Sequence, residues 1–150
     1  MTYFAWGSYL NTGHEMIDSD HRQLVGMINA LYDAIEKKQG QDVMGKVLDN
    51  LLLYCKVHFQ REEDEMQRIG YPKYLAHKRE HELFTVNVEK LKQSYDSGVP
   101  PNPVHIGKML SDWLRNHIVV VDMDLAGALN SLLKYFPILS AEWLREALLR

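Results

Sequence analysis

The fold is decided by residues 58–81, which read His-Phe-Gln-Arg-Glu-Glu-Asp-Glu-Met-Gln-Arg-Ile-Gly-Tyr-Pro-Lys-Tyr-Leu-Ala-His-Lys-Arg-Glu-His. The stretch begins with a histidine four residues before a glutamate and ends with two histidines four residues apart. On an α-helix, residues four apart lie on one face, about one turn apart. Between the pairs, Gly70 suits the position past a helix end and Pro72 the first turn of the next helix. The stretch predicts two antiparallel helices that present facing pairs of metal-ligand side chains.

Toward the N-terminus, leucine and isoleucine recur every three or four residues. They predict a first helix that has Asp18 or Ser19 as its N-cap and ends near Lys38, with Gly40 just beyond the end. Residues 1–17 lack a helical period, so we expect them to form an arm along the domain. The two helices of the central stretch are expected over about 41–67 and about 72–95.

Toward the C-terminus, Asn102 followed by Pro103 is typical of an N-cap and a first helical residue, and predicts the start of a fourth helix. Four helices joined by short turns predict an all-α, up-down-up-down four-helix bundle over residues 1–124. The sequence then becomes leucine-rich and is interrupted at Pro137. We expect residues 125–150 to form a C-terminal helical extension that packs on the bundle or on a partner.

The composition is that of a globular chain, with 46% apolar and 25% charged residues. A net charge of −3 and a pI near 6.1 provide no basic surface for nucleic acid or anionic membranes. The apolar runs fall short of the roughly 18 residues that a membrane span needs, and the N-terminus lacks the pattern of a secretory signal. We therefore expect no nucleic-acid or membrane partner and a cytoplasmic location. Because Cys55 is the sole cysteine, a bound metal would need nitrogen and oxygen ligands.

Seven polar residues interrupt the apolar helix stripes at positions where a core-facing helix should carry leucine or valine. Because neighbouring helices run antiparallel, all seven fall at the same end of the predicted bundle. They are His21, His58, Glu62, His77, His81, His117 and Asp122. Five imidazoles and two carboxylates exceed the ligand set of one tetrahedral ion but suit two octahedral ions bridged by the carboxylates. This mixture favours iron or manganese over magnesium or calcium, and we predict iron.

The motifs that carry these residues resemble those of the hemerythrins, and of the bacteriohemerythrins in particular. The matching segments are Ile-Asp-Ser-Asp-His ending at His21, His-Phe-Gln-Arg-Glu-Glu starting at His58, His-Lys-Arg-Glu-His starting at His77, and Trp113 to Asp122. The resemblance covers roughly residues 4–124 and implies a non-heme centre of two Fe ions, bridged by an oxo or hydroxo group and by carboxylates, that binds O2 reversibly. It implies His77, His81 and His117 on one iron, His21 and His58 on the other, which keeps an open position, and Glu62 and Asp122 as bridges.

The spacing between His117 and Asp122 does not fit a regular α-helix. Five residues turn about 140° beyond a full turn, so the two side chains would point in different directions. Either the helix contains a π-type turn here, or the side chains lean to meet. Asp124 returns to the face of His117 but lies about 10 Å along the axis, so reach and resemblance both favour Asp122.

Apolar residues near the predicted centre are candidates for an O2 pocket that excludes water. They are Trp113, Leu114, Ile118 and Cys55. Cys55 is also expected to be a small buried core residue. A solvent-facing position is expected for His14, His105 and the acidic run Glu63, Asp64 and Glu65.

Three functions could use such a centre. The first is a binding protein, not an enzyme, that transports, stores or delivers O2; imidazole-rich ligation favours this over the oxidase chemistry of diiron sites with about four Glu and two His. The second is a sensor of O2 or of redox state that signals through residues 125–150. The third is a diiron peroxidase or oxidase. Residues 125–150 are also a candidate contact for a second copy of the chain, a signalling partner or an oxidase.

Overall fold

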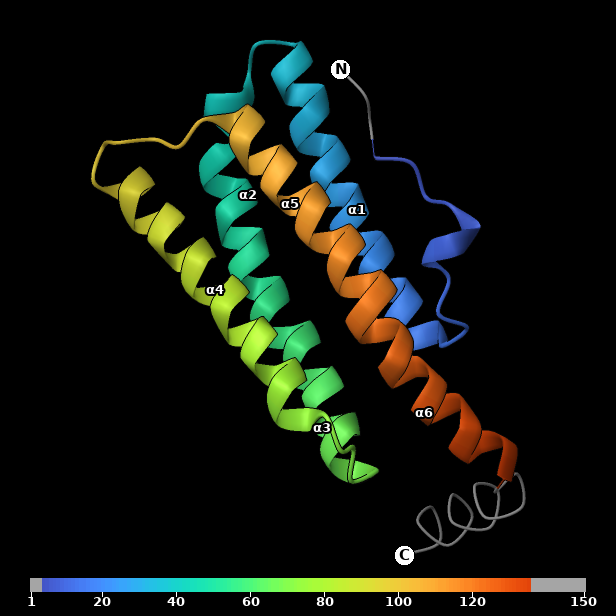
Figure 1. Cartoon of the computed structure of the whole chain (residues 1–150). Helices are drawn as coiled ribbons and strands as arrows, with labels where there is room; N and C mark the ends of the chain where they lie inside the picture. The colour runs from blue at the N-terminus through green and yellow to red at the C-terminus, as the bar shows by residue number, and fades with distance from the viewer. Residues whose placement is uncertain (1–3, 136–150) are drawn as a thin grey trace, which may run out of the picture.

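The chain folds as an all-α, up-down-up-down four-helix bundle, as predicted (Figure 1). This computed structural model describes residues 4–135. The first and third long helices are α1 and α4, whereas the second and fourth are each made of three consecutive helical segments. The segments are η1 (Ser8–Leu10), α1 (Glu15–Glu36), α2 (Gly40–Tyr54), η2 (Cys55–Phe59), α3 (Gln60–Arg68), α4 (Tyr74–Asp96), α5 (Pro103–Asn116), η3 (His117–Asp122) and α6 (Met123–Tyr135).

Two π-helical turns interrupt the long helices without breaking them. In the second helix, η2 joins α2 to α3, and in the fourth helix η3 joins α5 to α6. The second helix therefore spans residues 40–68, close to the predicted 41–67. The fourth helix continues through η3 into α6 as far as Tyr135.

The connections between helices confirm two of the sequence predictions. Gly70 adopts a left-handed φ of 63° after the end of α3, a conformation that costs glycine little. Asn102 caps α5, because its side chain accepts a hydrogen bond from the backbone N–H of Val104 at 2.9 Å. Pro103 is the first residue of that helix.

The first helix ends two residues before the predicted position near Lys38. The helix ends at Glu36, and Lys38 adopts the left-handed conformation with a φ of 58°. Gly40 instead begins α2. A Cβ atom at this glycine would lie 2.9 Å from the Cβ of Pro103, so the glycine permits a close approach between the starts of two helices.

The predicted N-cap of the first helix was also wrong. The helix begins at Glu15, with His14 in the N-cap position, so Asp18 lies inside its first turn. The carboxylate of Asp18 accepts hydrogen bonds from the backbone N–H and the hydroxyl of Thr12, at 2.9 and 2.7 Å. At the other end of the arm, the backbone N–H of Phe4 donates to the side chain of Asn29 at 2.8 Å. The arm is thus fixed along α1 at both ends (Figure 1).

The apolar core consists of two clusters on either side of the predicted ligands. The larger one fills the bundle from the helix ends near Ile106 up to Ile118. The smaller one contains Ile17, Met66, Leu125, Ala126 and Leu129. In the first, second and fourth helices, a predicted ligand separates the smaller cluster from the larger one along the chain. Ile17 precedes His21, Met66 follows Glu62 and Leu125 follows Asp122. The first part of the predicted extension therefore packs on the bundle through α6.

No helix among residues 4–135 is long and apolar enough to cross a membrane. The second part of the predicted extension, residues 136–150, lies outside the described residues. The predicted division of the chain between residues 124 and 125 stays a prediction.

Candidate metal centre

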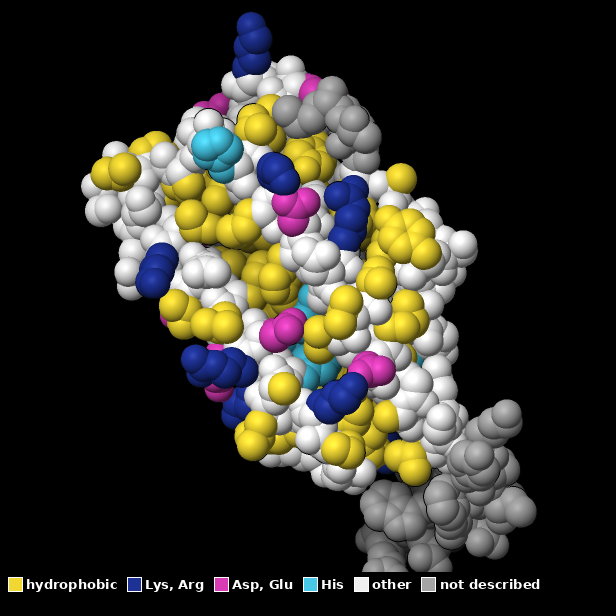
Figure 2. Space-filling view, viewed as in Figure 1, with side chains coloured by type: hydrophobic (Ala, Val, Ile, Leu, Met, Phe, Trp, Pro, Cys, Tyr) yellow, Lys and Arg dark blue, Asp and Glu magenta, His cyan; other side chains and the backbone are white. Residues whose placement is uncertain are grey.

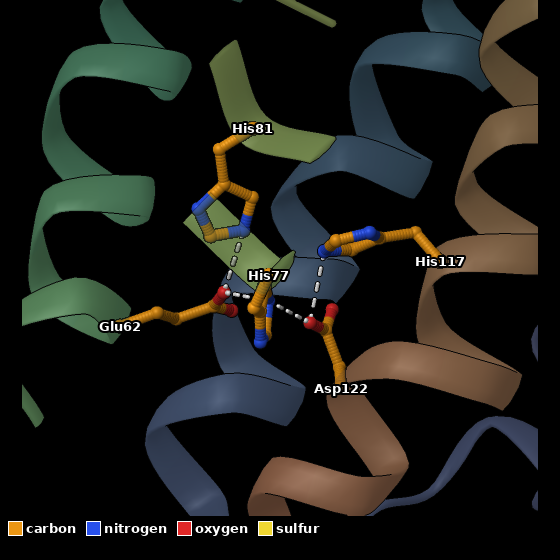
Figure 3. Close-up of side chains that lie close together, drawn as sticks. All are labelled: Glu62, His77, His81, His117 and Asp122. Atoms are coloured by element: carbon orange, nitrogen blue, oxygen red, sulfur yellow. Dashed lines mark ion pairs between the residues drawn. The ribbon is translucent and has the colours of Figure 1, made fainter. Parts of the chain in front are cut away.

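Five of the seven predicted ligands converge in the interior of the bundle (Figure 3). Each provides one ligand atom, and these atoms all lie within 4.8 Å of one another. They come from α3, from α4 and from both ends of η3, and all are buried. The five residues are Glu62, His77, His81, His117 and Asp122. Such a cluster of imidazoles and carboxylates is able to bind metal.

Asp122 lies at the centre of this cluster, and its two carboxylate oxygens face different histidines. Its Oδ1 atom is 3.0 Å from the Nε2 of His77 and 2.9 Å from the Nε2 of His117. Its Oδ2 atom is 2.6 Å from the Nε2 of His21, a sixth predicted ligand. Asp122 therefore connects the histidines of the third and fourth helices to the histidine of the first.

Glu62 approaches the same point from the second helix. Its Oε2 atom is 3.1 Å from the Nε2 of His81 and 3.4 Å from the Nε2 of His77. Within the described residues, five of these facing atoms are buried without a hydrogen-bond partner: the Nε2 atoms of His77, His81 and His117, Glu62 Oε2 and Asp122 Oδ1. Buried polar atoms without partners are costly and call for an explanation. Buried nitrogen and oxygen atoms that converge in this way are typical of the ligands of a metal ion.

The seventh predicted ligand, His58, lies beside the cluster on η2. It is buried, its Nδ1 atom is 2.7 Å from the Oδ1 of Asp20, and its ring lies 4.3 Å from that of Tyr54. Burial and the charges of Glu62 and Asp122 raise the pKa of Tyr54 well above its ordinary value, which keeps its phenol neutral. His58 thus contacts the first helix through Asp20 and is not among the five converging residues.

The two π-helical turns account for the orientation of the ligands. A π-helical turn contains more residues than the 3.6 of an α-helix, so residues five apart return to nearly the same face. His117 and Asp122 are the first and last residues of η3. Of the two alternatives for their spacing, the structure has the π-type turn. His58 lies in a second such turn, η2, which the sequence analysis did not anticipate.

Three carboxylates outside the predicted set contact the outer nitrogens of ligand histidines. His81 Nδ1 donates a hydrogen bond to Glu63 at 3.1 Å, and His117 Nδ1 donates one to Glu80 at 2.9 Å. Asp20 provides the third contact, with His58. A carboxylate at Nδ1 fixes the ring and directs Nε2 toward a metal.

Sequence reasoning missed these three residues. Glu63 was expected to face solvent but is buried, and its carboxylate contacts His81 of another helix. Asp20 and Glu80 each directly precede a predicted ligand, His21 and His81. The sequence feature that could have identified Asp20 and Glu80 was their position next to a predicted ligand histidine. His14 is half-buried rather than solvated, whereas His105 is exposed as expected.

Aromatic and aliphatic side chains surround the cluster. Trp113 stacks on His117 with ring centroids 4.4 Å apart, and Phe59 stacks on His81 at 3.9 Å. Leu114 and Ile118 are fully buried in the same core. Of the predicted pocket residues, these aliphatic side chains and Trp113 lie along the His117 segment. Phe59 was not predicted.

Cys55, the fourth predicted pocket residue, lies in the buried core at the start of η2. Burial raises the pKa of its thiol to about 11. The thiol is therefore protonated at neutral pH, in line with its expected role as a small apolar side chain.

In this cluster, protons on the histidines balance the negative charges of the buried carboxylates. Burial disfavours the charged imidazolium, yet the nearby Asp122 carboxylate raises the pKa of His117 to about 10. Burial would raise the pKa of Asp122, but His117 holds it well below its ordinary value. Contacts with Asp122 and Glu62 raise the pKa of His77 against the effect of burial. Metal ions can replace such protons, because both neutralise the buried carboxylates.

The cluster also approaches the protein surface. In the space-filling view, histidine side chains are visible between α4 and α5, with acidic side chains on both sides (Figure 2). The side chain of Glu80 is half-exposed, and its carboxylate accepts a hydrogen bond from His117.

Comparison with known proteins shows similarity in sequence and in fold. Residues 12–129 match the model of the hemerythrin HHE cation binding domain. The chain is 35% identical to a bacteriohemerythrin of Stenotrophomonas maltophilia over 136 residues, 91% of this chain and 88% of that one. It is 34% identical to a bacteriohemerythrin of Methylococcus capsulatus over 122 residues, 81% of this chain and 91% of that one. The solved structure of a wild-type hemerythrin superposes with a TM-score of 0.78 at 30% identity, covering 85% of this chain and 98% of that chain.

Proposed function

This chain belongs to the hemerythrin family, and we propose that it binds O2 reversibly at a pair of iron ions held by the buried cluster. The residues present fit that cofactor. His77, His81 and His117 would hold one iron, His21 and His58 the other, and Glu62 and Asp122 would bridge them. When bound, the iron supplies the electrons and the open coordination position that hold O2.

The orientation of the two carboxylate oxygens of Asp122 is the observation that supports this proposal. One oxygen points to His77 and His117, and the other points to His21 on a different helix. A carboxylate that bridges two metal ions has its oxygens directed in this way, toward separate sets of ligands. A single ion held by all of these residues would not need both oxygens.

The surroundings of the cluster support binding rather than substrate oxidation. Trp113, Leu114 and Ile118 form an apolar wall along the segment that carries His117. Apolar walls exclude water and protons from a reactive centre. Neutral imidazoles outnumber carboxylates among the proposed ligands, whereas diiron oxidases are built mainly from glutamate. We therefore propose a carrier or store of O2 and not an enzyme.

The test is a cycle of oxygenation on the iron-loaded protein. The protein would be loaded anaerobically with Fe(II), exposed to O2 and then evacuated while the visible spectrum is recorded. A new absorption band that appears with O2 and disappears under vacuum supports reversible binding. Irreversible conversion to a ferric spectrum, or turnover of added peroxide, would favour a redox sensor or a peroxidase instead.

Sensing is a second candidate function, and one observation favours it. The helix α6 begins at the residue after Asp122 and packs through Leu125 and Leu129 on the smaller apolar cluster. A change at the bridging carboxylate would therefore act directly on this helix. Proteolysis or hydrogen exchange of residues 123–135 should differ between the O2-bound and O2-free forms if the chain is a sensor, and should be the same if it is a carrier. A second copy of the chain, a signalling protein or an oxidase as the partner, and a cytoplasmic location, remain predictions.

A further inference from the structure

A surface groove of about 380 Å³ lies between α1 and the second helix, next to the candidate centre. Two of its residues come from α1 and six from the second helix. The lining residues are Gln23, Met27, Asn50, Leu53, Tyr54, Val57, His58 and Arg61.

The inner part of the groove is formed by buried rings. Tyr54 and His58 line it although only 5% and 7% of their surfaces are exposed. His58 is one of the two ligands proposed for the iron with the open position. The groove therefore leads from solvent to a residue that would hold that iron.

The outer part of the groove combines apolar and amide side chains with one cation. Leu53 and Val57 are 60% and 41% exposed, whereas the remaining outer residues are a methionine and two amides. Arg61 is the single permanently charged residue among the eight that line the groove. A positive charge at the mouth of a cleft with apolar walls attracts small anions.

The position of Arg61 is fixed by a buried partner. Its Nη1 atom is 3.2 Å from the Oδ1 of Asp20, and the same oxygen is 2.7 Å from the Nδ1 of His58. Asp20 is 1% exposed and Arg61 46% exposed, so the guanidinium and not the carboxylate faces an approaching ligand. Arg61, Asp20 and His58 thus form a continuous chain from the groove mouth to a proposed iron ligand.

We infer that this groove is the route by which small monovalent inorganic anions reach the iron, and that Arg61 selects them over neutral molecules. This inference rests on the proposed function, because it takes the iron at His58 as the destination. At a separation of about 6 Å in water, one charge changes the local concentration of a monovalent anion about threefold. The effect should decrease with ionic strength, because salt screens the guanidinium.

The test uses thiocyanate, which stays an anion at neutral pH and gives a charge-transfer band on ferric iron. Its association rate would be measured by stopped flow on the iron-loaded protein, together with the O2 association rate of the ferrous form. Arg61→Gln should lower the ratio of the thiocyanate rate to the O2 rate about threefold, and Arg61→Lys should restore it. Lys108→Gln is the matched control, since it removes one charge from an exposed site on α5 and should leave the ratio unchanged.

A second pair of variants tests the route itself. Leu53→Trp should obstruct the groove and slow both thiocyanate and O2 association, whereas Leu83→Trp, at a similarly exposed site on α4, should not. Equal ratios in Arg61→Gln and Lys108→Gln would overturn the selection by Arg61, and unchanged rates in Leu53→Trp would overturn the route.

A crystallographic readout separates this inference from the proposed function. Anomalous scattering from iodide soaked into crystals of the iron-loaded protein should locate iodide in the groove beside Arg61. Iodide found elsewhere and not in the groove would contradict the inference even if O2 binding is reversible. Failure of the wild-type protein to bind O2, with iodide present in the groove, would instead contradict the proposed function.

Discussion

His117 and Asp122 are five residues apart in the chain, yet the Nε2 of His117 lies 2.9 Å from the Oδ1 of Asp122. The π-helical turn η3 makes this possible, because it begins at the histidine and ends at the aspartate. An α-helix would separate the two side chains by about 140° around its axis. The geometry of the candidate centre therefore depends on a local departure from regular helix structure.

The first prediction concerns the proposed bridging role of Asp122. Asp122→Asn keeps the size of the side chain but removes the charge that would neutralise two metal ions, so iron content should fall from two ions per chain to one or fewer. Asp124→Asn is the matched control, because Asp124 is half-exposed and pairs with Lys73 instead. Iron per chain, measured by elemental analysis, checks both. Two retained irons in Asp122→Asn would show that this residue is not a bridge.

The second prediction concerns the carboxylate behind His58. Asp20→Asn should lower the affinity of the protein for metal about 10- to 100-fold, because the outer carboxylate orients the ligand ring. Asp18→Asn removes a buried carboxylate in the same stretch that bonds the arm through Thr12. It should reduce thermal stability without changing metal affinity. Competition with a chelator for Co(II) measures the affinity, and equal losses in both variants would contradict an orienting role.

The third prediction concerns the apolar wall. Ile118→Ala should cost about 2–5 kcal/mol of unfolding free energy and open a cavity beside His117, so the O2-bound form should oxidise faster. Ile106→Ala, at the other end of the bundle core, should cost a similar free energy without faster oxidation. Spectroscopic decay of the oxygenated form and chemical denaturation provide the two measurements. Equal decay rates in the two variants would show that the wall does not protect the centre.

The fourth prediction is a pH dependence of metal binding. The pKa of His117 is raised to about 10 without metal, above an ordinary value of about 6.5, so the metal-free cluster holds a proton at neutral pH. The metal must displace that proton, and its apparent affinity should therefore rise with pH, by up to about tenfold per unit for each proton released, and level off near pH 10. Chelator competition between pH 6 and 9 checks this. An affinity that does not change with pH would mean that no proton is displaced.

The sequence was sufficient for the four helices and for the five residues that converge inside the bundle. His58 and Glu62, and His77 and His81, follow the four-residue spacing that places side chains on one helix face. The apolar stripes and the Gly70 and Asn102 signals then determine how those helices are joined. These features are local, so a single sequence reveals them.

The remaining features depend on contacts between distant segments. Glu63 looked like part of a solvated run because it stands between other acidic residues, but it is buried against His81 of α4. Asp18 resembled an N-cap because aspartate commonly caps helices, but it bonds the arm instead. In both cases tertiary contacts outweighed the local preference of the residue.

The most direct test of the central claim is to measure how much O2 the iron-loaded protein takes up and returns. Ferrous protein of known iron content would be exposed to a measured amount of O2 and then evacuated, with the released gas quantified over repeated cycles. Reversible binding at an iron pair predicts one O2 taken up for every two irons and the same amount recovered in each cycle. O2 that is consumed and not recovered, or uptake unrelated to the number of iron pairs, would contradict it.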